Sequence, residues 1–277
     1  MASTFVVVPQ WQGSVSPRAM RLVDGAEMIR GDLPSSATEV VDIPIEAGDA
    51  IESGIHRLST ILVVRERQAA VLRGVPDWAL TIGGDCGVSL AAVEHAARKH
   101  PNDLALVWFD ARPRLHTSET SPSGGFGGMV LRAISGDGRP ELTLDAASSV
   151  PLDRIVLAGA RDMDDAEAEL IETHQIPVLS ANDLETPDAL LAALRAIGAT
   201  RVYLHVGLDV LDPAALTGLA DLVPFGLEVD ALTRAITAVR AEFTLAGASI
   251  AGFAPATIDA GNDDMSSLLR IIGALTR

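Results

Sequence analysis

The chain has 277 residues, a formal net charge of −16 and an aromatic content of only 4%. Because such a field repels phosphate backbones and anionic membranes, and few rings are available for base stacking, no nucleic-acid or membrane partner is expected. Hydrophobic residues make up 48% of the chain, enough for a sizeable buried core. A single cysteine, Cys86, and an N-terminal segment without the features of a signal peptide predict a soluble cytoplasmic protein.

Short apolar runs alternate with longer amphipathic segments along the chain. Strands are predicted at residues 4–9, 40–45, 78–82, 104–109, 154–157, 176–179, 202–208 and 248–253. Helices are predicted at residues 55–73, 89–99, 129–134, 164–173, 186–197, 228–243 and 263–275. This alternation predicts a parallel sheet with helices on both faces. Since no repeat or linker interrupts it, we predict one domain over residues 1–277.

Polar residues follow several of the predicted strands. In open α/β sheets the site lies at the carboxyl ends of the strands, so these segments are the candidates for function. They are residues 83–87, 110–116, 161–164, 207–213 and 252–255.

Some of these strand ends carry short motifs. Gly-Gly-Asp-Cys stands at 83–86, Asp-Ala-Arg-Pro-Arg at 110–114 and Gly-Ala-Arg-Asp-Met-Asp at 159–164. Further matching segments lie at 123–129, 205–213 and 224–227. In this order the six segments resemble the ureohydrolase family of arginases, agmatinases and formiminoglutamases. The resemblance implies the arginase-like three-layer α/β/α sandwich, with a mainly parallel sheet of about eight strands.

The resemblance also implies six ligand positions for two manganese ions, which activate a bridging hydroxide in active family members. These positions here hold Cys86, Asp110, Arg112, Arg114, Gly207 and Asp209. Only Asp110 and Asp209 retain the family's residue, so no metal cofactor is expected. The carboxylates of Asp110, Asp209 and Asp212 leave open a weak site for one divalent ion.

Two arginines stand where the family has metal ligands. If the chain stays extended after Asp110, alternation places Asp110, Arg112 and Arg114 on one face. Their guanidinium groups would then replace the positive charge of the metals and pair with Asp85, Asp110, Asp209 or Asp212.

The predicted ligand pocket contains ten residues. They are Asp85, Cys86, Asp110, Arg112, Arg114, His116, Asp164, His205, Asp209 and Asp212. Asp164 aligns with a family residue that helps to hold the amino end of the substrate.

Several of these positions have two interpretations. Cys86 is a candidate nucleophile, but a thiol packed into a vacated ligand position is favoured. His116 and His205 are candidates for relocated metal ligands, although a hydrogen-bonded core histidine is favoured at position 205. Gly127 and Gly252 stand where the family has a histidine and a glutamate for substrate handling or proton transfer.

Three functions remain open from the sequence. The first is a non-catalytic binding or regulatory homologue, assembled with itself or with an arginase-like paralogue. The second is a metal-independent enzyme that uses the inherited pocket, with Cys86 as a catalytic candidate and a small carboxylate- or amine-bearing substrate. The third is an active ureohydrolase, cleaving a C–N bond of a guanidino compound, with a relocated metal site.

Overall fold

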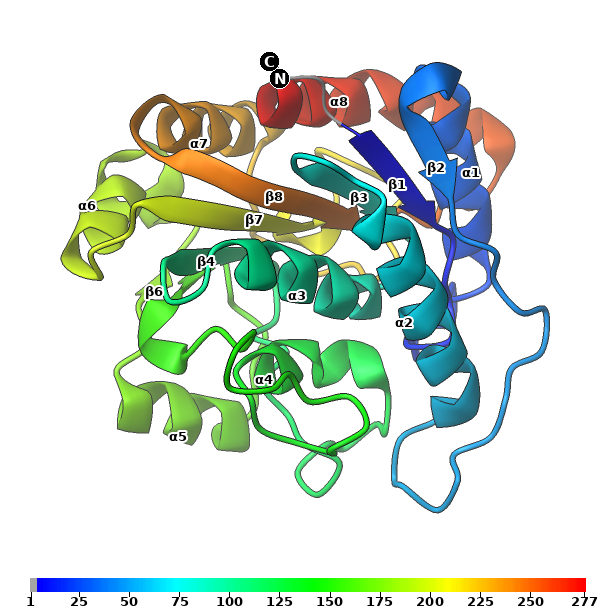
Figure 1. The fold of residues 1–277 in the computed structure, drawn as a ribbon. Helices are drawn as coiled ribbons and strands as arrows, with labels where there is room; N and C mark the ends of the chain where they lie inside the picture. Colours follow the sequence, from blue (N-terminus) through cyan, green and yellow to red (C-terminus); the bar gives the residue numbers. More distant parts are fainter. Residues whose placement is uncertain (1–3) are drawn as a thin grey trace.

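The computed structural model describes residues 4–277, so residues 1–3 of the predicted domain and N-terminal segment lie outside the described part. Eight strands form one sheet in the order β2-β1-β3-β8-β7-β4-β5-β6, and all neighbouring pairs are parallel (Figure 1). The strands are β1 (Thr4–Val8), β2 (Thr38–Val40), β3 (Ala79–Gly83), β4 (Leu104–Phe109), β5 (Ile155–Ala158), β6 (Val178–Leu179), β7 (Arg201–Gly207) and β8 (Thr244–Ala251).

Helices cover both faces of the sheet and complete the predicted three-layer architecture (Figure 1). One face packs against α1 (Arg21–Gly31), α6 (Asp188–Ala196), α7 (Val229–Glu242) and α8 (Ile258–Thr276). The other packs against α2 (Leu58–Arg73), α3 (Ser89–Lys99), α4 (Val130–Ile134) and α5 (Asp165–His174). Within residues 4–277, no helix combines the length and the apolar character needed to cross a bilayer.

The central strands explain where the site forms. Every residue of β4 is buried, with Val107 and Phe109 in one core layer and Leu106 and Trp108 in the other. Such a strand is apolar throughout because helices cover both of its faces. As all the strands are parallel, their carboxyl ends meet at one edge of the sheet, and the loops that follow them converge there.

One predicted strand was not found over its full extent, and one observed helix was not predicted. The strand predicted at 40–45 was wrong, because β2 ends at Val40 and Pro44 has no backbone N–H with which to extend the ladder. Helix α1 was not predicted, although Leu22, Ala26 and Ile29 recur at helical spacing and are buried.

Helix α6 also differs from its predicted start at residue 186. The helix begins at Asp188, and its N-cap Pro187 makes no side-chain cap hydrogen bond. The Thr186 hydroxyl instead donates to Oδ2 of Asp188 at 3.2 Å.

Candidate functional site

A cavity of about 390 Å³ opens at the carboxyl edge of the sheet. Eight of the ten predicted pocket residues meet there: Asp85, Cys86, Arg112, Arg114, His116, Asp164 and Asp209 line it, and Asp110 lies fully buried among them, bonded to Arg114. The structure therefore brings most of the predicted residues together, but the individual side chains make contacts that alternation alone did not predict.

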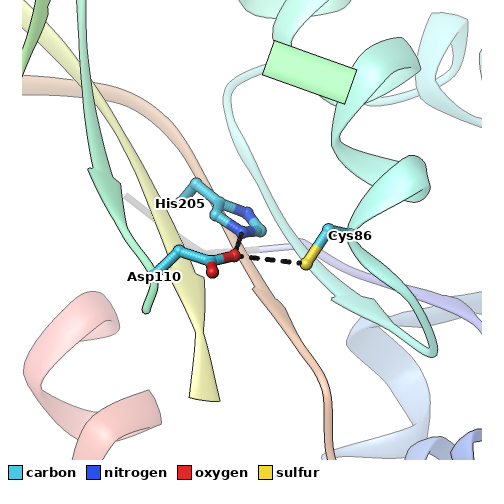
Figure 2. Close-up of side chains that lie close together, drawn as sticks. All are labelled: Cys86, Asp110 and His205. Atoms are coloured by element: carbon cyan, nitrogen blue, oxygen red, sulfur yellow. Dashed lines mark hydrogen bonds and ion pairs between the residues drawn. The ribbon is translucent and has the colours of Figure 1, made fainter. Parts of the chain in front are cut away.

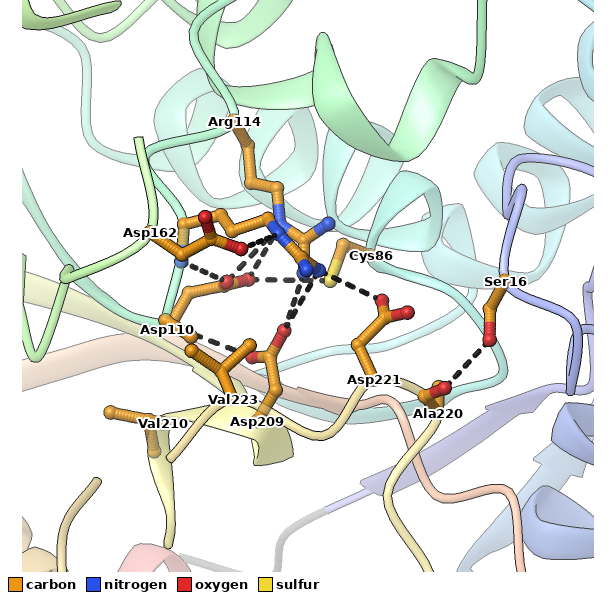
Figure 3. A network of polar contacts seen from close by, with 12 residues as sticks. Ser16, Cys86, Asp110, Arg114, Asp162, Asp209, Val210, Ala220, Asp221 and Val223 are labelled. Carbon is orange, nitrogen blue, oxygen red and sulfur yellow. Dashed lines mark hydrogen bonds and ion pairs between the residues drawn. The ribbon is translucent and has the colours of Figure 1, made fainter. Parts of the chain in front are cut away.

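The guanidinium of Arg114 lies between the two retained aspartates (Figure 3). Its Nε donates to both carboxylate oxygens of Asp110 at 3.0 and 3.1 Å, and its Nη2 donates to Oδ2 of Asp209 at 2.7 Å. Asp110 follows β4 and Asp209 follows β7, two strands that pair directly. One permanent cation therefore bridges two buried carboxylates from adjacent strands.

The backbone that positions Arg114 differs from the extended conformation that was expected. The chain does not continue as a strand after β4, and Arg114 has φ of +60°, in the left-handed region. Its carbonyl oxygen accepts hydrogen bonds from the backbone N–H groups of Leu131 and Arg132, which hold this turn against α4. The prediction of one shared extended face was wrong, because the turn directs Arg112 and Arg114 differently.

Arg112 lies nearer the mouth of the cavity, with 32% of its side chain exposed. Its Nε donates to Oδ2 of Asp162 at 2.8 Å, and its Nη1 lies 3.0 Å from Oδ2 of Asp221 and 3.9 Å from Asp209. Asp162 lies in one of the candidate segments, but neither it nor Asp221 was among the ten predicted pocket residues. Both lie in loops that follow strands of the sheet. No motif in the sequence links these aspartates to Arg112, and only the folded structure shows that they pair with it.

The two bridged aspartates differ in their tendency to ionise. Burial opposes ionisation of both, but the hydrogen bonds and charge of Arg114 hold the pKa of Asp110 well below its usual range. Burial and the charge of Asp110 then raise the pKa of Asp209 to about 7. Of the two aspartates that bind Arg114, Asp110 therefore ionises at lower pH than Asp209.

Cys86 lies against Asp110, with its Sγ 3.6 Å from Oδ2 of that carboxylate (Figure 2). The side chain is buried, and desolvation raises the pKa of the thiol well above its ordinary value. A nucleophilic cysteine needs a lowered pKa and access, so this arrangement favours a packed neutral thiol.

His205 lies deeper, under the site. Its ring stacks on Trp108 with centroids 3.6 Å apart, and its Nδ1 hydrogen bonds with the hydroxyls of Ser89 and Ser249 at 2.9 and 3.0 Å. Nε2 lies 3.8 Å from Oδ2 of Asp110, and burial lowers the pKa of the imidazole (Figure 2). His205 therefore supports Asp110 from the core and does not line the cavity.

Asp85 does not pair with an arginine as expected. Its carboxylate accepts hydrogen bonds from the backbone N–H groups of Gly13 and Gly87 at 2.9 and 2.7 Å and from Nε2 of Gln10 at 3.2 and 3.3 Å. Desolvation nevertheless raises its pKa to about 6. Asp85 thus links the loop after β3 to the loop after β1. The loop after β1 contributes residues 13–16 to the cavity lining, which were not predicted.

Asp212 lies outside the cavity lining, contrary to expectation. Its carboxylate accepts hydrogen bonds from the backbone N–H groups of Ala214 and Gly226 at 2.9 and 3.1 Å. Each oxygen of the Asp212 carboxylate thus has a backbone donor in the segment that follows β7, and neither pairs with Arg114.

A third group, His116, Asp164 and Glu167, lines another part of the cavity. Nε2 of His116 lies 3.4 Å from Oδ2 of Asp164 and 3.8 Å from Oε2 of Glu167. Asp164 caps α5 by accepting the backbone N–H of Glu167 at 3.0 Å. Sequence reasoning missed Glu167, although an aspartate followed three residues later by glutamate is the signature of a capping box.

The residues at the family's metal positions do not fit a pair of manganese ions. Cys86, Asp110 and His205 do bring three ligand atoms within 4.8 Å of one another. However, the cationic guanidinium of Arg114 already binds Asp110 and Asp209. At Gly207 a Cβ atom would lie 2.5 Å from Oδ2 of Asp110, so that carboxylate now fills the space beside the missing ligand.

The sequence profile of the arginase family matches residues 14–273. The chain belongs to the arginase family. An arginase of Staphylococcus aureus strain MRSA252 is 30% identical over 207 residues, which cover 72% of this chain and 67% of that protein. An N(omega)-hydroxy-L-arginine amidinohydrolase of Streptomyces lavendulae is 31% identical over 65% of this chain and 63% of its own length.

Solved arginase structures share the fold over nearly the whole chain. Entamoeba histolytica arginase, solved with L-ornithine, superposes with a TM-score of 0.84 at 20% identity and covers 99% of this chain and 97% of its own. Bacillus caldovelox arginase gives a TM-score of 0.78 at 25% identity, with 99% and 98% coverage. This arginase-family protein therefore has the fold of the solved arginases, with Arg114 bound between Asp110 and Asp209 at the carboxyl edge of its sheet.

Proposed function

We propose that this arginase-family protein is a non-catalytic binding or regulatory homologue that does not act as a manganese-dependent ureohydrolase. The observation that carries this proposal is the guanidinium of Arg114, bonded to both Asp110 and Asp209. A metal ion at that place would have to displace a cation that already satisfies both carboxylates. Its positive charge also repels an approaching divalent ion.

The cavity itself remains large enough for a small ligand. Two arginines suggest a carboxylate or phosphate ligand, but six carboxylates line the same cavity. The charges of Arg112 and Arg114 are taken up by the aspartates they bind. Asp164 and Glu167 are left without an arginine partner among residues 4–277, so the charge distribution supports an amine-bearing ligand.

The metal-independent enzyme is the weaker alternative. It requires a nucleophile or general base in the cavity, and the only thiol, Cys86, is buried beside a carboxylate that disfavours its ionisation. No other observation in residues 4–277 favours Cys86 as a catalytic residue.

The proposed regulatory role includes a protein partner. Following the resemblance to an oligomeric family, we propose a cytoplasmic protein that assembles with itself or with an arginase-like paralogue. Size-exclusion chromatography with light scattering tests self-assembly, and affinity purification from the native cell followed by mass spectrometry tests the paralogue.

The proposed absence of ureohydrolase activity is tested with excess Mn²⁺. The purified protein is assayed for hydrolysis of arginine, agmatine, guanidinobutyrate and formiminoglutamate, followed as urea or formamide. Bacillus caldovelox arginase, treated in the same way, serves as the positive control. We expect no turnover above that of the heated protein; Mn²⁺-dependent turnover that disappears in Asp110→Asn would overturn the proposal.

A further inference from the structure

His116, Asp164 and Glu167 present three potential metal-ligand atoms to the cavity, apart from the family's manganese positions. One ligand atom of each residue lies within 4.8 Å of the other two. Nε2 of His116 is 3.4 Å from Oδ2 of Asp164 and 3.8 Å from Oε2 of Glu167. A tetrahedral zinc ion with bonds of about 2.0–2.2 Å separates its ligand atoms by roughly 3.3–3.6 Å, so these two separations from His116 need only small side-chain adjustments.

The other polar atom of each side chain is already held, and this orients the three free atoms. Nδ1 of His116 hydrogen bonds with the hydroxyl of Thr120 at 3.2 Å. Oδ1 of Asp164 accepts the backbone N–H of Glu167, and Oε1 of Glu167 accepts the backbone N–H of Leu115 at 3.0 Å. Outer-shell hydrogen bonds of this kind fix the tautomer and the direction of metal ligands.

Burial gives a second, independent argument for a cation. Glu167 is only 5% exposed and His116 8% exposed, yet within residues 4–277 Oε2 of that glutamate receives no hydrogen bond. Oε2 retains some exposure to the cavity, so a cation bound there would give this carboxylate oxygen the partner it lacks within the described residues.

We propose that His116, Asp164 and Glu167 form a binding site for one divalent transition-metal ion, preferentially zinc, with a fourth coordination position open to the cavity. One imidazole nitrogen and two carboxylate oxygens suit zinc, whereas calcium and magnesium prefer oxygen ligands alone. The site does not depend on the proposed loss of ureohydrolase activity, because Arg114 and the family's manganese positions take no part in it.

The test is zinc binding by the full-length protein after removal of metals with a chelator. Zinc affinity is measured by competition with a chromophoric chelator, and cobalt substitution reports the coordination geometry. We expect one zinc ion per chain and an affinity at least tenfold weaker in His116→Ala and in Glu167→Gln. Glu167→Gln retains an oxygen for Leu115, so its fold is checked by thermal melting.

Two control variants locate the ion. Cys86→Ser removes a potential ligand at the family's metal position, and His174→Ala removes a histidine at the end of α5. Both should bind zinc as tightly as the parent. Equal affinity in His116→Ala, or loss of zinc in Cys86→Ser, overturns the proposal, as does the absence of stoichiometric binding by the parent. A manganese-dependent hydrolysis that survives His116→Ala would refute the proposed function and leave the zinc result to stand separately.

Discussion

Arg114 places Nη2 2.7 Å from Asp209 while its Nε contacts Asp110 at 3.0 Å, so one side chain pairs with two buried aspartates. Both aspartates are almost completely buried, and the arginine side chain is 12% exposed. Breaking one member of such a network leaves charge in a medium that solvates it poorly. The arginine is therefore expected to be important for the stability of the fold.

Replacement of this buried cation should be strongly destabilising. We expect Arg114→Leu to lower the free energy of unfolding by about 3–5 kcal/mol, since it leaves two buried carboxylates without their cation. Arg112→Leu is the matched control, because Arg112 is 32% exposed and its loss should cost no more than about 1 kcal/mol. Urea unfolding followed by circular dichroism measures both, and equal losses would contradict the central role of Arg114.

Restoring family residues at two positions should recover metal binding. In Arg112→His with Arg114→Asp, the repelling cations are gone and a histidine and a carboxylate join Asp110 and Asp209. We expect Mn²⁺ affinity to rise at least tenfold and Mn²⁺ to raise the melting temperature of the double variant. Titration calorimetry and thermal melting measure this; unchanged affinity would mean that the two arginines do not govern access to the site.

The third missing ligand should be harder to restore. A Cβ atom at Gly207 would lie 2.5 Å from Oδ2 of Asp110. We therefore expect Gly207→Ala in the parent to cost roughly 1–3 kcal/mol by overpacking. The same substitution should cost less in an Arg114→Asp background, where Asp110 is no longer held by the guanidinium. A double-mutant cycle of unfolding free energies tests this coupling, and additive costs would argue against it.

The fold could be predicted from the sequence because strands and helices are marked by patterns within short segments of the chain. Strands such as β4 are uniformly apolar, and motifs at strand ends gave the order of the segments around the cavity. The pairing of Arg114 with Asp110 was one of several that the resemblance and the charges suggested. Its left-handed turn did not, because the hydrogen bonds that hold it come from α4, later in the chain.

Other side chains escaped prediction for a similar reason. Two of the donors to Asp85 lie on the loop after β1, more than 70 residues away, and no charge pattern in the sequence marks Gln10 or Gly13 as donors. Asp212 accepts one hydrogen bond from Ala214 in its own turn and one from Gly226, farther along the chain. Glu167 was detectable in principle, since it follows the helix-capping Asp164 at capping-box spacing.

The Cys86 thiol should be unreactive in the folded protein. It is 6% exposed, and desolvation raises its pKa well above the ordinary value. We expect a thiol-reactive chromogenic disulfide to label the native protein at pH 8 at less than roughly one tenth of the rate in denaturant. Unfolded protein provides the control, with one thiol per chain. Rapid native labelling with an apparent pKa below 8 would favour the nucleophilic interpretation.

Asp85 should make a distinctive contribution to the pH dependence of stability. Its pKa is raised by burial from 3.8 to about 6, so between these values the folded state binds a proton that the unfolded state has released. Stability from this group is therefore complete below about pH 4, falls as the pH rises to about 6, and is constant above it. Two pKa units correspond to about 3 kcal/mol.

Buried histidines have the opposite effect on the pH dependence of stability. The test therefore compares the parent with the Asp85→Asn variant. Burial lowers the pKa of His95 to about 4 and also lowers that of His205, and such groups make stability rise with pH over a similar range. In Asp85→Asn the histidine contribution remains while the aspartate contribution is removed. We expect the unfolding free energy of the variant, minus that of the parent, to increase by about 3 kcal/mol between pH 4 and pH 7. If this difference in unfolding free energy did not change with pH, the pKa of Asp85 would be ordinary. If the difference decreased, the hydrogen bonds from Gln10 and Gly13 would lower the pKa more than burial raises it.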